Sequence, residues 1–411
     1  MSTDWTPARR VAFRFGVVYL TLFGLATQIS GSLIASPWFA YRGMGRLWPM
    51  REITHWVGRA VFGITVPLDD VSGGETLFFW IQWFWLIAAS VVIAAIWTLA
   101  STRRSYATWL PRIRLAVRLV LAASLLEYGM TKVIPTQFPA PPLTALVTPV
   151  GEMTLSAVLW TTIGSAPAYQ IITGCIEVLA GVLLILPWTV TLGALIGLLS
   201  LLQVLLLNLT FDIGVKLVTT HLIVLAVILL APAARGMAVW PRFRAEPFTS
   251  ARAIGGQLLF AAYLLGVLTY INLNFWQVAG GGRPQSVLYG IWNVERLLVD
   301  GQDRPPAMND YDRRWRRVIF DAPGELVVQR TDDSFARYGV SVDHGRGAMT
   351  LSKGGGRTWT SRLTYDRRSD DRLTIAGDMD GHTIEADLRR VERDAWPLLN
   401  SRFRWIRPHD P

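Results

Sequence analysis

The chain has 411 residues and a formal net charge of +10, with 51% hydrophobic residues, 17% charged residues and a mean hydropathy of +0.33. So apolar a composition is unusual for a water-soluble chain and predicts an integral membrane protein whose main partner is the lipid bilayer. The basic excess lies mostly in short segments between apolar runs, so it indicates no nucleic-acid partner. A single cysteine, Cys175, excludes an intrachain disulfide.

Charged residues divide the chain into two parts. Residues 1–282 hold only 18 of the 40 Lys and Arg and 10 of the 30 Asp and Glu. A bilayer-embedded region carries few charges, because each one costs several kcal/mol near mid-membrane. We therefore expect a transmembrane domain over 1–279, a glycine-rich linker over 280–286 and a soluble domain over 287–411.

Seven apolar segments of the first part reach the length of about 20 residues that crosses the hydrocarbon core as a helix. The predicted spans are 11–35, 76–101, 113–134, 167–187, 189–210, 213–232 and 251–276. The first span follows a basic N-terminus but is longer than a signal peptide requires, so we expect it to be retained. The proline-rich stretch 137–167 is expected to form short helices that cap the outer face of the bundle.

Arginines between the spans orient the predicted bundle. Three lie between the second and third spans and three between the sixth and seventh, and each group is followed by a fourth at the start of the next span, Arg114 and Arg252. This predicts that both segments are cytoplasmic. The N-terminus is then cytoplasmic and the C-terminal domain extracytoplasmic. Four arginines between the first two spans are evidence against this orientation. Trp48, Ile53 and Trp56 in that segment fit either a helix lying in the membrane interface or an ordinary packed helix.

Polar residues inside the predicted spans are the strongest functional signal, because such residues are costly in a membrane. Most of them fall in the outer half of the bundle, where they would form a polar pocket open to the outer leaflet. The candidate ligand-binding residues are Glu127, Tyr128, Lys132, Glu177, Asn208, Asp212, Lys216 and His221. Alternatively, the acidic and basic members are ion pairs that hold the helices in register.

No catalytic residue is assigned and no metal site is expected. His221 has no second His or Cys at ligand spacing, so an interhelical hydrogen bond is its expected role. Cys175 is expected to be a small packing residue.

Residues 118–232 resemble the DoxX family, and more closely a group of longer DoxX-like bacterial membrane proteins, over about residues 40–245. The resemblance rests on short motifs at Glu127–Lys132, Gln137–Pro139, Gly174–Gly181 with Glu177 between, Asn208–Lys216 and Gly73–Thr76. In the last motif the longer group has Ser-Gly-Asp-Thr where this chain has Gly-Gly-Glu-Thr.

The resemblance implies a four-helix core made of the third to sixth spans, in the bacterial inner (cytoplasmic) membrane. In some members this core is associated with redox chemistry such as thiosulfate oxidation coupled to quinone. It is also similar to the core of vitamin K-dependent carboxylases, which use a quinol. The sequence has no haem-type His pair, CxxC, dinucleotide-binding loop or nucleophile elbow. A redox role therefore implies a quinone cofactor or a protein partner in a redox complex.

The C-terminal part is predicted to be all β. Short alternating segments are separated by Gly, Asp and Asn, which is typical of antiparallel strands. The candidate strands are 288–295, 315–320, 325–330, 335–342, 348–352, 358–365, 372–376, 382–391 and 403–406. Eight or nine strands without a long helix predict a closed up-and-down barrel.

The start of the barrel resembles the Gly-x-Trp of lipocalin-like barrels. Gly290 and Trp292 carry this motif, and Arg404, or alternatively Arg402 or Arg407, would pack over the tryptophan. The resemblance implies a structural role at the barrel floor. A barrel of this size either fills with side chains or holds one small molecule, and the sequence does not distinguish the two.

Three functions follow from these patterns. The leading hypothesis is a DoxX-like protein that binds a quinone-like or other hydrophobic small molecule in the outer-leaflet pocket, within a membrane redox or envelope-maintenance system. This hypothesis makes the chain a candidate subunit of a membrane oxidoreductase and leaves open whether it is itself an enzyme. The alternatives are a non-catalytic transporter or lipid carrier that passes an apolar ligand to the external barrel, and a structural anchor for that domain.

Overall fold

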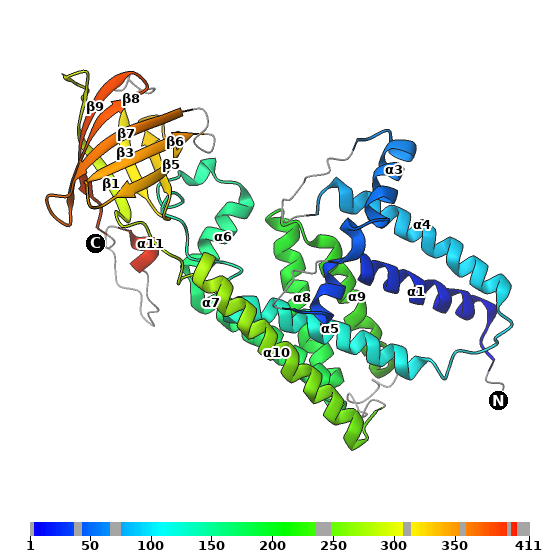
Figure 1. Ribbon diagram of the computed structural model, residues 1–411. Coiled ribbons are helices and arrows are strands. Elements are labelled where there is room, and N and C mark those ends of the chain that lie inside the picture. The colour runs from blue at the N-terminus through cyan, green and yellow to red at the C-terminus, as the bar shows by residue number, and fades with distance from the viewer. Residues whose placement is uncertain are drawn as a thin grey trace. The chain divides into compact units, whose positions relative to one another are not determined.

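The computed structural model describes residues 4–36, 43–65, 75–234, 248–306, 314–353, 359–392 and 396–400. The chain forms two compact units. The first contains residues 1–137 and 168–275 and is helical, and the second contains residues 138–167 and 276–411 and is built around a β-barrel (Figure 1).

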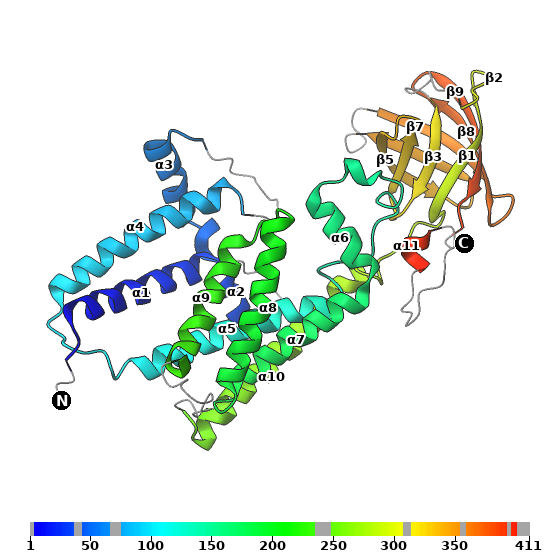
Figure 2. The ribbon, with the colours of Figure 1, turned by 180° about the vertical axis from the view of Figure 1, so that it is seen from behind.

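The helices of the first unit occupy all seven ranges where spans are predicted. They are α1 (Pro7–Ala26), α2 (Gln28–Leu33), η1 (Met44–Arg46), α3 (Met50–Phe62), α4 (Leu77–Ala100), α5 (Leu110–Val133), α7 (Pro167–Ile185), α8 (Val190–Thr210), α9 (Lys216–Ala234) and α10 (Ala251–Ala279). Helices α8 and α9 pack side by side and are joined by a short turn (Figure 2). Helix α1 packs along α4.

The expectation of seven spans is supported only for four helices. Among the described residues, α4, α7, α8 and α10 are long and apolar enough to cross a membrane. Helix α1 carries three arginines, α5 carries five charged side chains, and the apolar part of α9 is shorter. These charges and the short length lower the hydropathy signal of the three helices, although the helices themselves form.

The first predicted span is broken. Helix α1 begins at the cap Thr6, whose side chain accepts a hydrogen bond from the backbone of Arg9, with Pro7 at the first helical position. It ends at Thr27, which is extended (φ −103°, ψ 175°) and whose hydroxyl donates to the carbonyl of Phe23 at 2.8 Å. Since Ser and Thr side chains compete with the helical backbone for such carbonyls, the chain turns here and starts α2.

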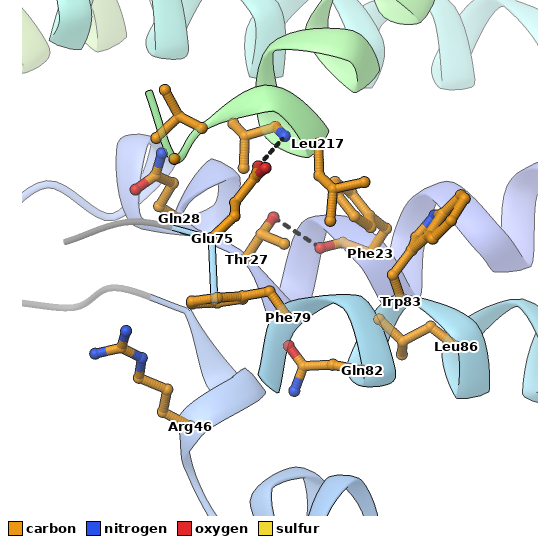
Figure 3. A pocket seen from close by; sticks show the side chains of 13 residues that line it. Phe23, Thr27, Gln28, Arg46, Glu75, Phe79, Gln82, Trp83, Leu86 and Leu217 are labelled. Atoms are coloured by element: carbon orange, nitrogen blue, oxygen red, sulfur yellow. Dashed lines mark hydrogen bonds between the residues drawn. The ribbon is translucent and has the colours of Figure 1, made fainter. Parts of the chain in front are cut away.

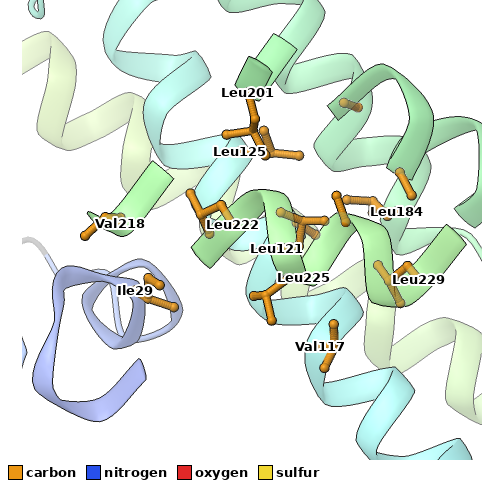
Figure 4. Packing of buried hydrophobic residues seen from close by; sticks show 14 of the residues in the cluster. Ile29, Val117, Leu121, Leu125, Leu184, Leu201, Val218, Leu222, Leu225 and Leu229 are labelled. Carbon is orange, nitrogen blue, oxygen red and sulfur yellow. The ribbon is translucent and has the colours of Figure 1, made fainter. Parts of the chain in front are cut away.

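Buried aliphatic side chains from α2, α5, α7, α8 and α9 form the main core of the helical unit (Figure 4). Glycines allow α5 and α7 to approach closely. A Cβ on Gly174 would lie 2.7 Å from the carbonyl oxygen of Gly129, and a Cβ on Gly181 would lie 2.8 Å from the side chain of Leu126. Such contacts are typical of small residues at helix interfaces in membranes.

Helix α3 has one packed face and one exposed face. Val57 is buried against Phe78 and Ile81 of α4, whereas Trp56 on the other face is 62% exposed. The packed face agrees with the second alternative expected for this segment, and the placement of the exposed face in a membrane interface stays a prediction.

The second unit confirms the predicted antiparallel barrel. Its strands are β1 (Gly290–Val299), β2 (Gln302–Asp303), β3 (Trp315–Phe320), β4 (Glu325–Arg330), β5 (Phe335–Asp343), β6 (Ala348–Lys353), β7 (Trp359–Asp366), β8 (Arg372–Met379) and β9 (His382–Arg390). All pairs are antiparallel, and β1 pairs with β9 to close the barrel. The two-residue β2 only extends the end of β1. The predicted strand 403–406 lies outside the described residues.

Trp292 occupies the centre of the barrel core. Its side chain is completely buried, and its Nε1 donates to the carbonyl of Leu288 at 2.9 Å. Arg390 on β9 lies opposite Trp292 on β1. A Cβ added to Gly290 would lie only 2.9 Å from the Nε of Arg390, so a larger residue at position 290 would collide with this arginine. With φ at +149°, Gly290 is also in a conformation that favours glycine. Arg402, Arg404 and Arg407, expected over Trp292, lie outside the described residues.

The stretch expected to cap the helical bundle belongs to the barrel's unit. It contains η2 (Val150–Glu152) and α6 (Leu155–Ser165), and its Leu143 and Val147 are buried with barrel residues. The backbone of Leu143 donates to Asp321 at 3.0 Å, and Gln329 donates to the carbonyl of Val147 at 3.1 Å. This expectation is therefore corrected, because these apolar and backbone groups find their partners on the strands.

Side chains fill most of the barrel interior, and a cavity of about 270 Å³ remains at one end. Trp315, Arg330, Tyr338 and His382 are among its lining residues. A short helix, α11 (Pro397–Asn400), follows the barrel.

Candidate functional site

The centre of the candidate site is a buried ion pair between α5 and α7. The Nζ of Lys132 lies 2.6 Å from Oε2 of Glu177, and the two side chains are only 8% and 3% exposed. The hydroxyl of Ser200 on α8 donates to the other oxygen of Glu177 at 3.4 Å. Helices α5, α7 and α8 therefore contact one another at a single buried ion pair.

Two neighbouring residues of α5 are held by the short helix α2. The amide of Gln28 donates to the hydroxyl of Tyr128, and the hydroxyl of Ser32 donates to the carboxylate of Glu127. The Nζ of Lys132 lies 3.4 Å from the carbonyl of Tyr128 and 5.9 Å from its ring centroid. The break at Thr27 matters here, because it turns α2 so that Gln28 and Ser32 face α5.

A pocket lies on the other side of Gln28, between α1, α4 and the start of α9 (Figure 3). Apolar side chains, including Phe23, Phe79 and Trp83, form much of its wall. Gln28 lines this pocket and also contacts Tyr128, so it connects the pocket with the Lys132–Glu177 pair.

Glu75 is the acidic group of this pocket. One carboxylate oxygen accepts the backbone N–H of Val218 at 3.1 Å, in the first turn of α9, where an N-terminal helix dipole favours negative charge. The other oxygen, Oε2, is buried and has no hydrogen-bond partner among the residues that the structure describes. Burial raises the pKa of the Glu75 carboxyl, although the backbone N–H groups act in the opposite direction.

Several candidate residues lie apart from this cluster. Asn208 donates to Thr219 at 3.0 Å, which joins α8 and α9. Asp212 and Lys216 form a 2.8 Å pair in which Asp212 is 87% exposed, so this pair is a surface contact. His221 has the expected interhelical hydrogen bond: its Nε2 lies 2.5 Å from the hydroxyl of Tyr19.

The sequence analysis missed Gln28, Ser32, Glu75 and Ser200. The first two fall inside an apolar span without a neighbouring charge, and no local pattern marks the helix break that orients them. Glu75 has one signal, its place in the Gly73–Thr76 motif, but its contact with Val218 depends on a helix 143 positions later.

Among the described residues, no group of three His, Cys, Asp or Glu is arranged to hold a metal ion.

Comparison with known proteins gives one informative similarity. No family model matches the chain, and no solved structure matches it. The DoxX and lipocalin resemblances therefore stay predictions. The chain is 38% identical to the uncharacterized protein YwoB of Bacillus subtilis over 116 residues, which cover 28% of this chain and 71% of YwoB. On the strength of that coverage, the chain belongs to the family of YwoB.

Proposed function

We propose that this protein binds a quinone-like or other hydrophobic small molecule in the Gln28–Glu75 pocket. It would do so as a DoxX-like protein within a membrane redox or envelope-maintenance system. The observation that supports the proposal is the unpartnered, buried Oε2 of Glu75 beside apolar walls. A buried acceptor without a donor is costly, and a ligand that donates a hydrogen bond removes this cost.

The polar groups of the pocket suit a hydroxyl group carried on a ring, and its enclosed volume of about 70 Å³ admits only the hydroxyl-bearing edge of such a ring. Glu75 supplies an acceptor, and the Gln28 side chain supplies an amide at the same wall. Phe79 and Trp83 supply aromatic faces against which a ring packs, and Arg46 lies over the ring of Phe79 at 5.2 Å.

The proposed topology keeps seven spans. In α1 and α5, which lack a strong hydropathy signal, the inner charged groups have partners on neighbouring segments. Arg14 donates to the hydroxyl of Tyr106 at 2.9 Å, Arg118 donates to Gln257, and Lys132 forms an ion pair with Glu177. Charged groups that are hydrogen-bonded or ion-paired are less costly in a bilayer. With the N-terminus in the cytoplasm of a bacterium, the Glu75 pocket faces the outer leaflet of the inner membrane and the barrel is extracytoplasmic.

A redox role would require a protein partner that carries the electron acceptor. The chain itself has one cysteine and five histidines, and the described histidines form no paired site. We therefore limit the proposal for this chain to binding the ligand and accepting its hydrogen bond.

The experiment compares wild type with Glu75→Gln. The glutamine keeps the size of the side chain, and its oxygen still accepts from Val218, but an NH2 group replaces the unpartnered oxygen. Protein purified in mild detergent is extracted with organic solvent, and quinones and other lipophilic molecules are measured by mass spectrometry per mole of protein. We expect a loss of about 10-fold or more, as for the removal of a hydrogen bond to a charged group.

The matched control is Glu152→Gln, because Glu152 is an exposed residue of the other unit. Two results would refute the assignment of the ligand to this pocket. The first is equal retention of the same ligand by Glu75→Gln and by the control. The second is wild-type protein that contains no such molecule and binds none when ubiquinone or menaquinone is added.

A non-catalytic carrier is the second candidate function. The cavity of about 270 Å³ at one end of the barrel favours it, because that volume could receive part of an apolar ligand. A carrier predicts that labelled ligand moves between two vesicle populations faster with the whole protein, and that it emerges chemically unchanged. A purely structural anchor predicts neither bound ligand nor transfer.

A further inference from the structure

A second and larger cavity lies in the helical unit, between α1, α5 and α9. Its volume is about 610 Å³, within the range of small-molecule sites. Its lining on α1 runs from Arg9 to Leu25, which corresponds to a length of about 24 Å at the helical rise of 1.5 Å per residue. The cavity is therefore an elongated groove, a shape that suits a hydrocarbon chain better than a compact ring.

Two glycines keep this groove open. Gly16 and Gly24 both line it, and a Cβ built on either residue would meet no atom within 4 Å. They differ in this respect from Gly129 and Gly174, which are needed for close helix contact. Glycine inside a helix is unfavourable by roughly 0.5–1 kcal/mol relative to alanine. Gly16 and Gly24 line the groove, so the space that a Cβ would take at these two positions is part of the groove.

Positive charge lies at one end of the groove. Arg9 is exposed at the start of α1 and stacks over Trp5 at 4.2 Å. Arg114 also lines the groove, and it donates to the carbonyls of Ile228 and Leu229 at 3.3 and 3.2 Å. The first of these carbonyls is the one that Pro232 leaves without its helical N–H. The walls between this end and His221 are almost entirely apolar.

We propose that this groove is a binding site for a membrane phospholipid with an anionic headgroup. One acyl chain lies along Gly16 and Gly24, and the phosphate is near Arg9. An apolar groove with a cationic end matches a lipid with an apolar chain and an anionic end, and basic side chains near a membrane surface attract such headgroups. This groove shares only Phe23 with the Glu75 pocket and is lined by neither Glu75 nor Gln28, so it does not depend on the proposed function.

The test fills the groove with side chains. In the variant Gly16→Leu with Gly24→Leu, the added Cβ atoms meet no atom within 4 Å, and the rest of the two leucine side chains takes up space in the groove. The matched control is Gly256→Leu with Gly266→Leu on α10, where an added Cβ also meets nothing within 4 Å but the residues do not line the groove. All proteins are reconstituted in nanodiscs of equal phosphatidylglycerol and phosphatidylcholine, released into detergent, and examined by native mass spectrometry.

We expect wild type and the α10 control to retain phosphatidylglycerol, and the groove variant to retain at least 10-fold less. Arg9→Gln should keep a bound lipid but lower the preference for phosphatidylglycerol by about five-fold, the effect of one basic residue near the membrane surface. Glu75→Gln should change neither value, which separates this result from the test of the polar pocket.

Three results would overturn the proposal: equal phosphatidylglycerol on the groove variant and wild type, equal loss in the α10 control, or a groove-dependent ligand without phosphate. The milder variant Gly16→Ala with Gly24→Ala keeps the test valid if the leucine variant does not fold, because it should reduce retention without abolishing it.

Discussion

The interiors of the two units differ in how many polar and charged side chains they bury. The barrel interior is a continuous apolar cluster that includes Trp292 and residues of every strand except β2, and the buried polar groups of this unit, such as Arg314 and Gln329, are hydrogen-bonded at its margin. The helical unit buries an ion pair, a carboxylate without a second partner and several hydrogen-bonded amides beside its apolar core. Apolar filling stabilises a fold without further chemistry, whereas buried charge is costly unless it is paired. The comparison supports the proposal that the ligand binds in the helical unit.

The largest expected effect is on the Lys132–Glu177 pair. Glu177→Ala leaves a buried ammonium without a partner and should lower the free energy of unfolding by about 3–5 kcal/mol. Unfolding by heat or SDS in detergent, monitored by tryptophan fluorescence, measures this loss. Lys132→Met combined with Glu177→Leu should recover most of this loss, because no charge then remains buried.

The exposed pair of Asp212 and Lys216 provides the control for that experiment. Asp212→Asn should change the unfolding free energy by no more than about 0.5 kcal/mol, because exposed pairs contribute little. If the two single variants were equally destabilised, burial would not be the reason for the importance of the Lys132–Glu177 pair.

The barrel should respond to loss of volume. Trp292→Ala leaves a cavity in a filled core and should cost about 3–5 kcal/mol. Hydrogen exchange of the intact protein measures the effect, with faster exchange expected in β1, β3 and β9 and little change in α5 and α7. Trp292→Phe keeps most of the volume but loses the hydrogen bond to Leu288, so its effect should be smaller. Equal effects of the two variants would assign the role of Trp292 to the hydrogen bond alone.

The smallest expected effect concerns surface charge on the barrel. The His382 side chain, 2.7 Å away, and the backbone N–H of Thr383 hold the pKa of the Asp300 carboxyl below its ordinary value of 3.8. A depressed pKa stabilises the fold above the unfolded-state value and loses this effect as the pH falls through the folded-state value. The contribution should therefore be present at pH 5 and decline below about pH 4.

Barrel unfolding by urea, compared between wild type and Asp300→Asn at several pH values, measures this contribution. The difference between the two proteins should be present at pH 5 and shrink at pH 3. A difference that is constant across the pH range would show that the charge of Asp300 is not responsible.

Most of the barrel could be predicted, because its information is local. In β1, Trp292 and Val294 point inward and Asn293 points outward, which is the alternation visible in the sequence. The strand β2 was not predicted, since two residues are too few to show alternation. The placement of Leu143 and Val147 on the barrel was also missed, because their partners are more than 100 positions away in the chain.

In the helical unit, the sequence predicted the positions of the helices better than the contacts of the candidate site. Apolar runs predicted where helices form, and the mid-span Glu177 was correctly singled out as unusual. The break at Thr27 was not predicted, because a threonine hydroxyl that binds a carbonyl in the preceding turn occurs both in intact and in interrupted helices. Glu75 depends on the start of α9, so only the tertiary structure reveals its position.

The contact between Arg114 and the carbonyl that Pro232 leaves free has a consequence for membrane insertion. On the proposed seven-span topology, α5 enters the bilayer before α9, because it precedes α9 in the chain. The Arg114 guanidinium would then be in place to donate to the carbonyl of Ile228 when α9 inserts, so that this carbonyl would not be left without a donor in the hydrocarbon.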